Sequence, residues 1–191
     1  MPHVRYGVDL GGVLWPFMRG EITEDLALDN GPVPHVFDWM ARLVAHIGSE
    51  NVFIVSKVGR RGEKMWGSVL HKSGFYRVTG MQPQNVHWVR DRTGDDGKAP
   101  VVAWLKLTHF VDDRSDVLCD IREHYRFAEL PTPVLYLVPT TSWTDQGARA
   151  DFKDIQRAKR ESRSYNLTFA SCLSEVPLPP CRLRPRCPNV S

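Results

Sequence analysis

Acidic residues stand at the ends of two short apolar segments. Asp9 follows Val4–Val8, and Asp112 and Asp113 follow His109–Val111. If both segments are parallel strands, these acids lie at the carboxyl edge of the sheet, where ligands bind in open α/β proteins. Carboxylates that meet there repel one another unless a cation lies between them. A hard divalent ion with oxygen ligands, above all Mg²⁺, would remove that repulsion.

The elements that must position these acids alternate along the chain. Apolar β-type runs alternate with segments of helical periodicity, which predicts an α/β fold with a doubly wound, mostly parallel sheet. Right-handed crossovers would then bring Asp9, Ser56 and the acid pair to one edge. The expected strands are 4–8, 52–55, 85–89, 108–111 and 134–138, and the expected helices are 35–47, 62–73, 99–107 and 114–124.

Four segments in this order resemble motifs of the haloacid dehalogenase (HAD) superfamily. Gly7–Leu14 is similar to the first motif, an apolar strand ending in Asp, and Phe53–Ser56 to the second, a strand ending in Ser or Thr. Lys98 stands where the third motif places its lysine, and Thr108–Arg114 resembles the fourth, a strand ending in paired acids. The resemblance covers residues 4–138 and implies a HAD-like Rossmannoid fold of the phosphatase type.

The resemblance implies a catalytic role for three of these residues. Asp9 would be the nucleophile that attacks phosphorus and forms an aspartyl-phosphate. Ser56 would hydrogen-bond a phosphoryl oxygen. Lys98 would offset negative charge in the transition state. The reaction implied is Mg²⁺-dependent hydrolysis of a phosphoester.

The resemblance also implies a metal site and a phosphate cradle. The Mg²⁺ ligands would be Asp9, the main-chain carbonyl of Gly11, and Asp113, with Asp112 bound directly or through water. Gly11 and Gly12 would let the backbone turn tightly and bring N–H groups near the phosphate, together with Ser56 and Lys98.

One position departs from the family pattern. Two residues after the nucleophile, the family has an acid that protonates the leaving group and activates water, and here that residue is Gly11. Loss of such a group costs a factor of roughly 10²–10⁴ in rate. Gly11 therefore leaves a second hypothesis open, a non-catalytic phosphate-binding module.

The lengths of the connecting segments bear on the substrate. About residues 11–34 can form only a small flap, and no insertion between Ser56 and Lys98 is large enough for a cap domain. An open site suits a bulky phosphorylated substrate, with a nucleotide as one candidate. The expected organisation is one α/β domain over 1–144 and a basic polar extension over 145–191, with a flexible, proline-rich end from about 164.

The charge and composition of the chain limit the classes of partner that it is expected to bind. Residues 1–144 carry 16 Lys and Arg against 17 Asp and Glu, a net charge of −1, whereas residues 145–191 carry 9 against 5, a net charge of +4. The domain therefore has no general nucleic-acid signature, and only the tail arginines give weak support for one. No signal peptide or membrane span is evident, so a cytoplasmic location is expected. The cysteines show no CxxC pair, and Cys119 is expected in the core.

Simpler interpretations compete at each position. The acids could be helix N-caps that follow strands, and Ser56 could be a capping serine. Lys98 could be a solvated loop lysine, with the relevant amine at Lys57, Lys64 or Lys106. Trp15 and Phe17 could stack on a base or pack on the core, and Arg60 and Arg61 could bind a phosphate or begin a helix.

Overall fold

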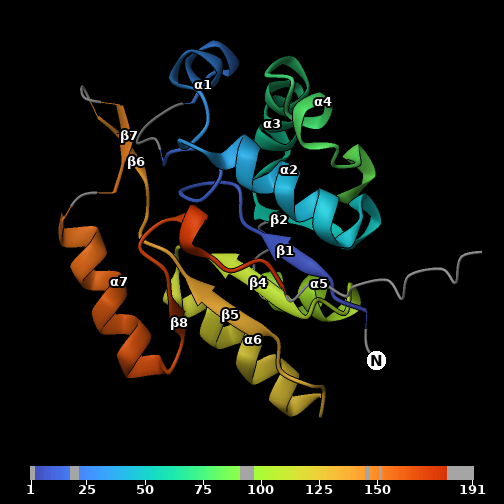
Figure 1. The fold of residues 1–191 in the computed structure, drawn as a ribbon, viewed down its shortest axis with the longest axis vertical. Helices are drawn as coiled ribbons and strands as arrows, with labels where there is room; N and C mark the ends of the chain where they lie inside the picture. The colour runs from blue at the N-terminus through green and yellow to red at the C-terminus, as the bar shows by residue number, and fades with distance from the viewer. Residues whose placement is uncertain (1–2, 18–21, 91–96, 145–146, 151, 180–191) are drawn as a thin grey trace, which may run out of the picture.

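The chain folds around a six-stranded, all-parallel sheet. The computed structural model describes residues 3–17, 22–90, 97–144, 147–150 and 152–179. The strand order is β3-β2-β1-β4-β5-β8, and helices flank the sheet on both faces in a Rossmann-like arrangement (Figure 1). This confirms the predicted α/β fold class. Within the described part of the chain, no helix has the length and apolar character needed to cross a membrane.

The element bounds follow the predicted alternation closely. The strands are β1 (Tyr6–Val8), β2 (Val52–Lys57), β3 (Val86–Val89), β4 (His109–Asp112), β5 (Val134–Leu137), β6 (Ser142–Thr144), β7 (Gly147–Arg149) and β8 (Thr168–Phe169). The helices are α1 (Glu24–Asn30), α2 (Val36–Ile47), α3 (Arg60–Lys72), α4 (Phe75–Thr79), α5 (Lys98–Trp104), α6 (Ser115–Phe127) and α7 (Phe152–Tyr165). Short 3-10 turns are η1 (Ser49–Asn51), η2 (Pro83–Asn85) and η3 (Leu173–Glu175).

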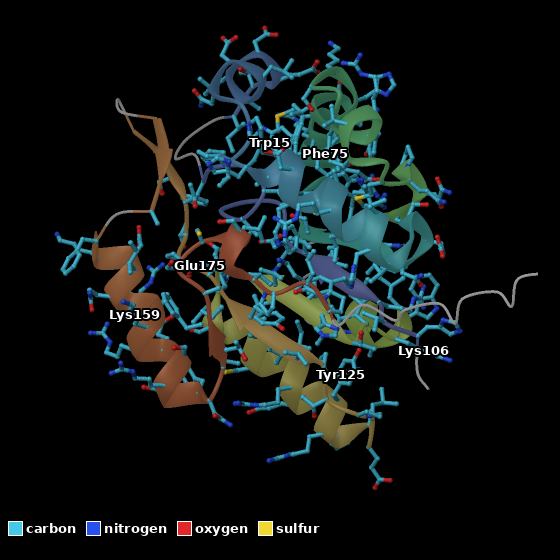
Figure 2. The ribbon with its side chains drawn as sticks, viewed as in Figure 1. Trp15, Phe75, Lys106, Tyr125, Lys159 and Glu175 are labelled. Carbon is cyan, nitrogen blue, oxygen red and sulfur yellow. The ribbon has the colours of Figure 1, made fainter. Side chains whose placement is uncertain are left out.

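The two faces of the sheet carry separate apolar cores. Along β2, Ile54 belongs to the core beneath α2 and α3, whereas Phe53 and Val55 belong to the core beneath α5 and α6. This is the period-two alternation of a strand that is buried on both faces. The first core also contains Trp15 and Phe75, whose ring centroids are 6.2 Å apart (Figure 2).

Several elements were not predicted from the sequence. Residues 11–34 were expected to form a small flap, and their described part contains a tight loop and the helix α1. The Thr23 hydroxyl caps α1 by accepting the Leu26 N–H at 3.2 Å. Helix α4 and the antiparallel pair β6–β7 are further additions. Each of these is too short for its periodicity to be recognised in sequence.

The expectation of a chain end without fold from about residue 164 is wrong for residues 166–179. Thr168 and Phe169 form β8, which pairs in parallel with β5 and completes the sheet. Beyond it, Val176 is buried in the first core, and its carbonyl accepts the indole N–H of Trp39 at 3.2 Å. Burial of a few apolar residues outweighs the polar composition of this segment. Residues 180–191, with Cys181 and Cys187, lie outside the described residues.

Two smaller expectations also need correction. The segment 148–163 was expected to form an exposed helix, but α7 packs against α6 and buries Ala158 and Ser162. Cys119 was expected in the core, but it is only partly buried, and its sulfur accepts a hydrogen bond from Arg122 at 3.7 Å.

Candidate functional site

The site lies where the winding of the sheet changes direction. From the central β1 the chain proceeds outward through β2 and β3, and it then returns to β4 and proceeds outward on the other side. In open α/β sheets such a switch point leaves a crevice at the carboxyl ends of the two central strands. Because β1 and β4 pair in parallel, with Val8 opposite Val111, Asp9 and Asp112 emerge side by side at this point.

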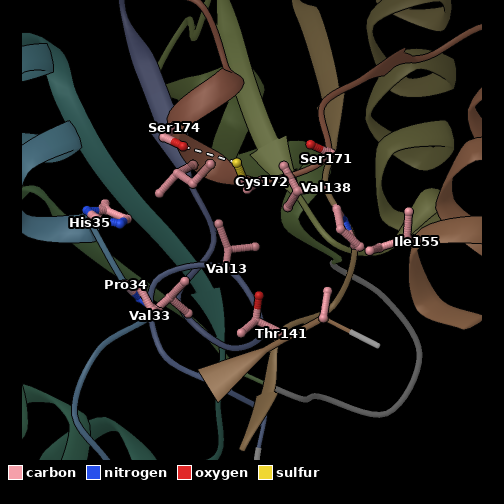
Figure 3. A pocket seen from close by; sticks show the side chains of 14 residues that line it. Val13, Val33, Pro34, His35, Val138, Thr141, Ile155, Ser171, Cys172 and Ser174 are labelled. Atoms are coloured by element: carbon pink, nitrogen blue, oxygen red, sulfur yellow. Dashed lines mark hydrogen bonds between the residues drawn. The ribbon is translucent and has the colours of Figure 1, made fainter. Parts of the chain in front are cut away.

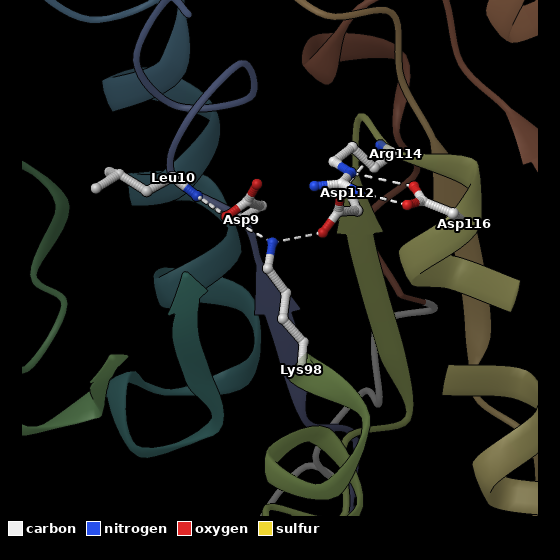
Figure 4. Close-up of polar contacts among 6 residues, drawn as sticks. All are labelled: Asp9, Leu10, Lys98, Asp112, Arg114 and Asp116. Atoms are coloured by element: carbon white, nitrogen blue, oxygen red, sulfur yellow. Dashed lines mark hydrogen bonds and ion pairs between the residues drawn. The ribbon is translucent and has the colours of Figure 1, made fainter. Parts of the chain in front are cut away.

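A buried lysine joins these two acids. Lys98 is the first residue of α5, and its ammonium lies 2.7 Å from Asp9 Oδ1 and 2.6 Å from Asp112 Oδ2 (Figure 4). Its side chain is only 5% exposed. The interpretation of Lys98 as a solvated loop lysine is therefore wrong, because the sheet and α5 enclose the amine between two carboxylates.

Asp113 completes an acidic triad. One oxygen from each of Asp9, Asp112 and Asp113 lies within 4.8 Å of the other two. This confirms the prediction that the strand-end acids converge. All three side chains are largely buried. A cluster of oxygen donors with this spacing could bind a metal ion.

The electrostatics of the cluster reflect a shortage of positive charge. Burial raises the pKa of Asp112 to about 7 against the lowering influence of Lys98, and the Asp9 and Asp113 charges add to the rise. Burial and the Asp9 charge likewise raise the pKa of Asp113 to about 6. Burial by itself would lower the pKa of Lys98, but the Asp112 and Asp9 carboxylates raise it above its ordinary value. The lysine is therefore a fixed cation.

The acids do not act as helix N-caps. The N-cap residue of α6 is Arg114, which makes no side-chain capping bond. Asp112 accepts the Arg114 N–H at 2.9 Å through Oδ1, and Asp9 accepts the N–H of the adjacent Leu10 at 2.7 Å. These short-range contacts orient the two carboxylates within the site. Helix capping therefore does not explain the positions of Asp9 and Asp112.

The loop after β1 fits tightly against the triad. Gly12 has φ +79°, and a Cβ atom built there would lie 2.4 Å from Asp113 Oδ2. Its N–H donates to the Trp15 carbonyl at 2.7 Å. The contribution of Gly12 in this conformation is therefore steric, since only glycine allows the backbone so close to Asp113. Its expected N–H contact with phosphate stays a prediction.

Gly11 lies in a different environment. No atom approaches within 4 Å of a Cβ built there. Among the described groups, none donates a hydrogen bond to its carbonyl oxygen. The carbonyl is thus available as the predicted metal ligand, and the position has room for a side chain.

A matched pair of alanine substitutions should separate the two glycines. Gly12→Ala is expected to lower the free energy of unfolding by about 1–3 kcal/mol, because it combines strained φ with a clash against Asp113. Gly11→Ala should change it little, since its Cβ enters open space. Urea unfolding monitored by tryptophan fluorescence measures both. Equal effects of the two substitutions would contradict this reading of the loop.

Ser56 is at the same edge as the acids, but its place in the strand puts its side chain on the opposite face of the sheet from Asp112. It is buried near the end of β2. Alternation along β2 places the Ser56 side chain on the same face as Ile54, toward α2, whereas alternation along β4 places Asp112 on the same face as Phe110, toward α5. Within the described residues, no hydrogen bond joins Ser56 to the triad. Its predicted contact with a phosphoryl oxygen stays a prediction.

Two residues near the triad were not predicted from the sequence. The Thr140 hydroxyl hydrogen-bonds Asp113 and partly offsets the rise in its pKa. Arg157, from α7, donates to Thr140 Oγ1 at 3.0 Å. The signal for Thr140 was a polar residue just beyond an apolar strand, the same rule that selected Asp9. Nothing in the sequence pattern marked Arg157, because its position depends on how α7 packs.

The remaining candidates take ordinary positions. Trp15 is fully buried in the core, which rules out stacking on a ligand, whereas Phe17 is half exposed. Arg60 and Arg61 begin α3, as the simpler interpretation held. The alternative amines Lys57, Lys64 and Lys106 are not among the ion pairs of Asp9 and Asp112.

The donor set fits a hard divalent cation. One ammonium faces three carboxylates, and the raised pKa values of Asp112 and Asp113 indicate that more positive charge would be accommodated there. Carboxylates and a main-chain carbonyl are ligands of the kind that Mg²⁺ and Ca²⁺ prefer. In sequence comparisons, the chain matches no protein-family model and no curated protein.

Proposed function

We propose that this protein is a Mg²⁺-dependent phosphoester hydrolase that works through an aspartyl-phosphate on Asp9. The observation that carries the proposal is the ion-pair geometry of Lys98, which holds Asp9 and Asp112 together within a triad of carboxylates. A buried lysine bridging two acids at a switch point suits the transfer of an anionic group, because the lysine offsets charge that the group brings.

The contacts of Asp9 support one of its two oxygens as the attacking atom. Lys98 and the Leu10 N–H both bind Oδ1, at 2.7 Å each. No described group donates to Oδ2, so Oδ2 is the oxygen open to attack phosphorus. Its attack forms the Asp9 O–P bond and breaks the bond between phosphorus and the ester oxygen, which leaves with its electron pair.

Asp112 and Asp113 have different roles in the proposed site. Asp112 uses Oδ2 for Lys98 and Oδ1 for the Arg114 N–H, so its main task is to fix the ammonium beside Asp9. Asp113, held by Thr140, is better placed as a metal ligand, together with Asp9 and the Gly11 carbonyl. A bound Mg²⁺ would offset the charge of the phosphoryl oxygens and orient the group.

The second step needs water to attack the aspartyl-phosphate and release Asp9. With glycine at position 11, no side chain there can take the proton from that water or supply one to the leaving group. The first step tolerates this loss when the leaving group is a weak base. Release of phosphate should therefore limit turnover.

The same glycine supports an alternative function. A protein that binds phosphate through Lys98 and a metal ion, without turnover, would need no acid at position 11. The open space beside Gly11 is consistent with it. The two proposals differ in turnover, which the substitution of Gly11 described below measures directly.

A thermal-melt experiment tests the metal site. Addition of Mg²⁺ at about 100 times its dissociation constant should stabilise the wild type by about 2.7 kcal/mol, through selective binding to the folded state. Asp113→Asn should lose most of this stabilisation. Asp116→Asn is the matched control, because Asp116 is an exposed partner of Arg114 on α6. Equal Mg²⁺-induced shifts in the wild type and Asp113→Asn would exclude Asp113 as a ligand.

The metal-free protein should also respond to pH in a defined direction. The pKa values of Asp113 and Asp112, about 6 and about 7, exceed the 3.8 of an ordinary aspartate, so the folded state binds protons more readily than the unfolded chain. Stability from this source is present at low pH and is lost as the pH rises from about 4 to about 7. The stabilisation by Mg²⁺ should grow over the same range.

A further inference from the structure

A second feature lies beside the triad, a cavity of about 260 Å³ (Figure 3). Its walls come from five separate parts of the chain: the loop after β1, the segment before α2, the segment after β5, α7 and the C-terminal segment. Two of these parts also touch the triad. Gly12 lines the cavity and abuts Asp113, and Val138–Thr141 includes Thr140, which hydrogen-bonds Asp113. The cavity and the acid site therefore share walls.

The lining of the cavity is mainly apolar, and it includes the imidazole of His35. Val13, Val33, Val138, Ile155 and Leu173 contribute aliphatic side chains. No Lys, Arg, Asp or Glu lies among the described residues that line it. The polar groups at the rim are partly engaged with each other, since Cys172 Sγ lies 3.0 Å from Ser174 Oγ. Apart from the His35 imidazole, a second phosphate or a carboxylate on a ligand would find no basic side chain among the described lining residues.

The C-terminal wall of the cavity is held in place by the fold. Ala170 donates its N–H to Leu137 at 3.1 Å, directly before Ser171. Leu173, at the start of the turn η3, and Val176, directly after it, are both buried in the core. The wall formed by residues 171–174 is thus fixed at both ends, so the cavity is largely preformed, as small-molecule pockets usually are.

We infer that this cavity receives the uncharged, apolar alcohol portion of a small phosphate monoester while its phosphoryl group lies at the triad. The inference rests on the proposed phosphoryl site. The volume falls just below the roughly 300–1,000 Å³ of pockets for drug-sized ligands, which fits one small ring or a short branched chain. Nucleoside diphosphates and sugar bisphosphates are disfavoured, because among the described lining residues the His35 imidazole is the only basic side chain that could meet their second anionic group.

Two non-hydrolysable ligands with the same headgroup test this without relying on turnover. In the presence of Mg²⁺, phenylphosphonate should bind the wild type about tenfold more tightly than methylphosphonate, because its ring is removed from water in the cavity. Isothermal titration calorimetry measures the ratio of the two dissociation constants. Ile155→Trp, which fills the cavity from α7, should bring this ratio close to one.

Two further variants serve as a second cavity-filling test and as a surface control. Cys172→Trp fills the cavity from its C-terminal wall at an exposed position, so it reports even if Ile155→Trp does not fold. Gln156→Trp adds the same side chain to the exposed surface of α7 and should keep the tenfold ratio.

Each result has a distinct meaning. Equal affinities for the two phosphonates in the wild type would overturn the inference and leave the phosphoryl site standing. A phenyl preference that survives both filling variants would place the ring elsewhere and also overturn it. If neither phosphonate binds, the phosphoryl site itself fails, and the inference fails with it.

Discussion

Replacing Asp9 by asparagine is expected to abolish hydrolysis of an activated aryl phosphate. The amide is a poor nucleophile, and loss of a nucleophile that forms a covalent intermediate costs on the order of 10⁴-fold or more in kcat. The side chain keeps its size, so the contact of Oδ1 with the Leu10 N–H can persist. Initial rates of aryl alcohol release in the presence of Mg²⁺ measure the effect.

Two controls keep this result specific. Asp116→Asn makes the same chemical change on the surface of α6 and should retain full activity. Acid quenching during turnover should trap one phosphoryl group on the wild type and none on Asp9→Asn, as seen by the mass of the intact protein. Activity of Asp9→Asn within about tenfold of the wild type would show that another group attacks phosphorus.

The second large effect concerns Gly11. Wild-type protein should release about one equivalent of aryl alcohol in a burst and then turn over slowly, because the aspartyl-phosphate accumulates when no base activates water. Gly11→Asp should restore the acid and raise the steady-state rate by about 100-fold, the low end of what a positioned acid or base contributes. The space beside Gly11 is open, so the new side chain can be accommodated.

Gly11→Asn is the matched control for that experiment. It fills the same space without an ionisable group, so it should leave the slow phase unchanged. Stopped-flow measurement resolves both the burst and the steady state. If neither the wild type nor Gly11→Asp turns over, while Mg²⁺ still stabilises the protein, the phosphate-binding module becomes the better account.

The local pattern of the sequence determined the sheet and the acids that end its strands. Short β-branched runs such as 52–55 are buried on both faces, and that requirement is visible residue by residue. Because parallel strands share a carboxyl edge, the alternation of strands and helices also predicted that Asp9, Asp112 and Asp113 would meet. The triad confirms this.

Tertiary packing determined side-chain positions that the local sequence pattern does not encode. Ser56 was expected at the same edge of the sheet as Asp9 and lies there, but the pleat of β2 places its side chain with Ile54 on the α2 side. Lys98 was one of several candidate amines, and the docking of α5 on the sheet selected it by enclosing its ammonium between two carboxylates.

The C-terminal segment shows most clearly that a local sequence pattern cannot predict structure that depends on distant partners. Its proline content and polarity predicted no fold, yet β8 joins the sheet, and Leu173 and Val176 reach the core. An edge strand of two residues carries almost no periodic signal, and its stability comes from hydrogen bonds and burial supplied by partners distant in sequence. The sequence by itself thus determined the central sheet and its acidic edge, and only the assembled structure decided which side chains line the cavity beside them.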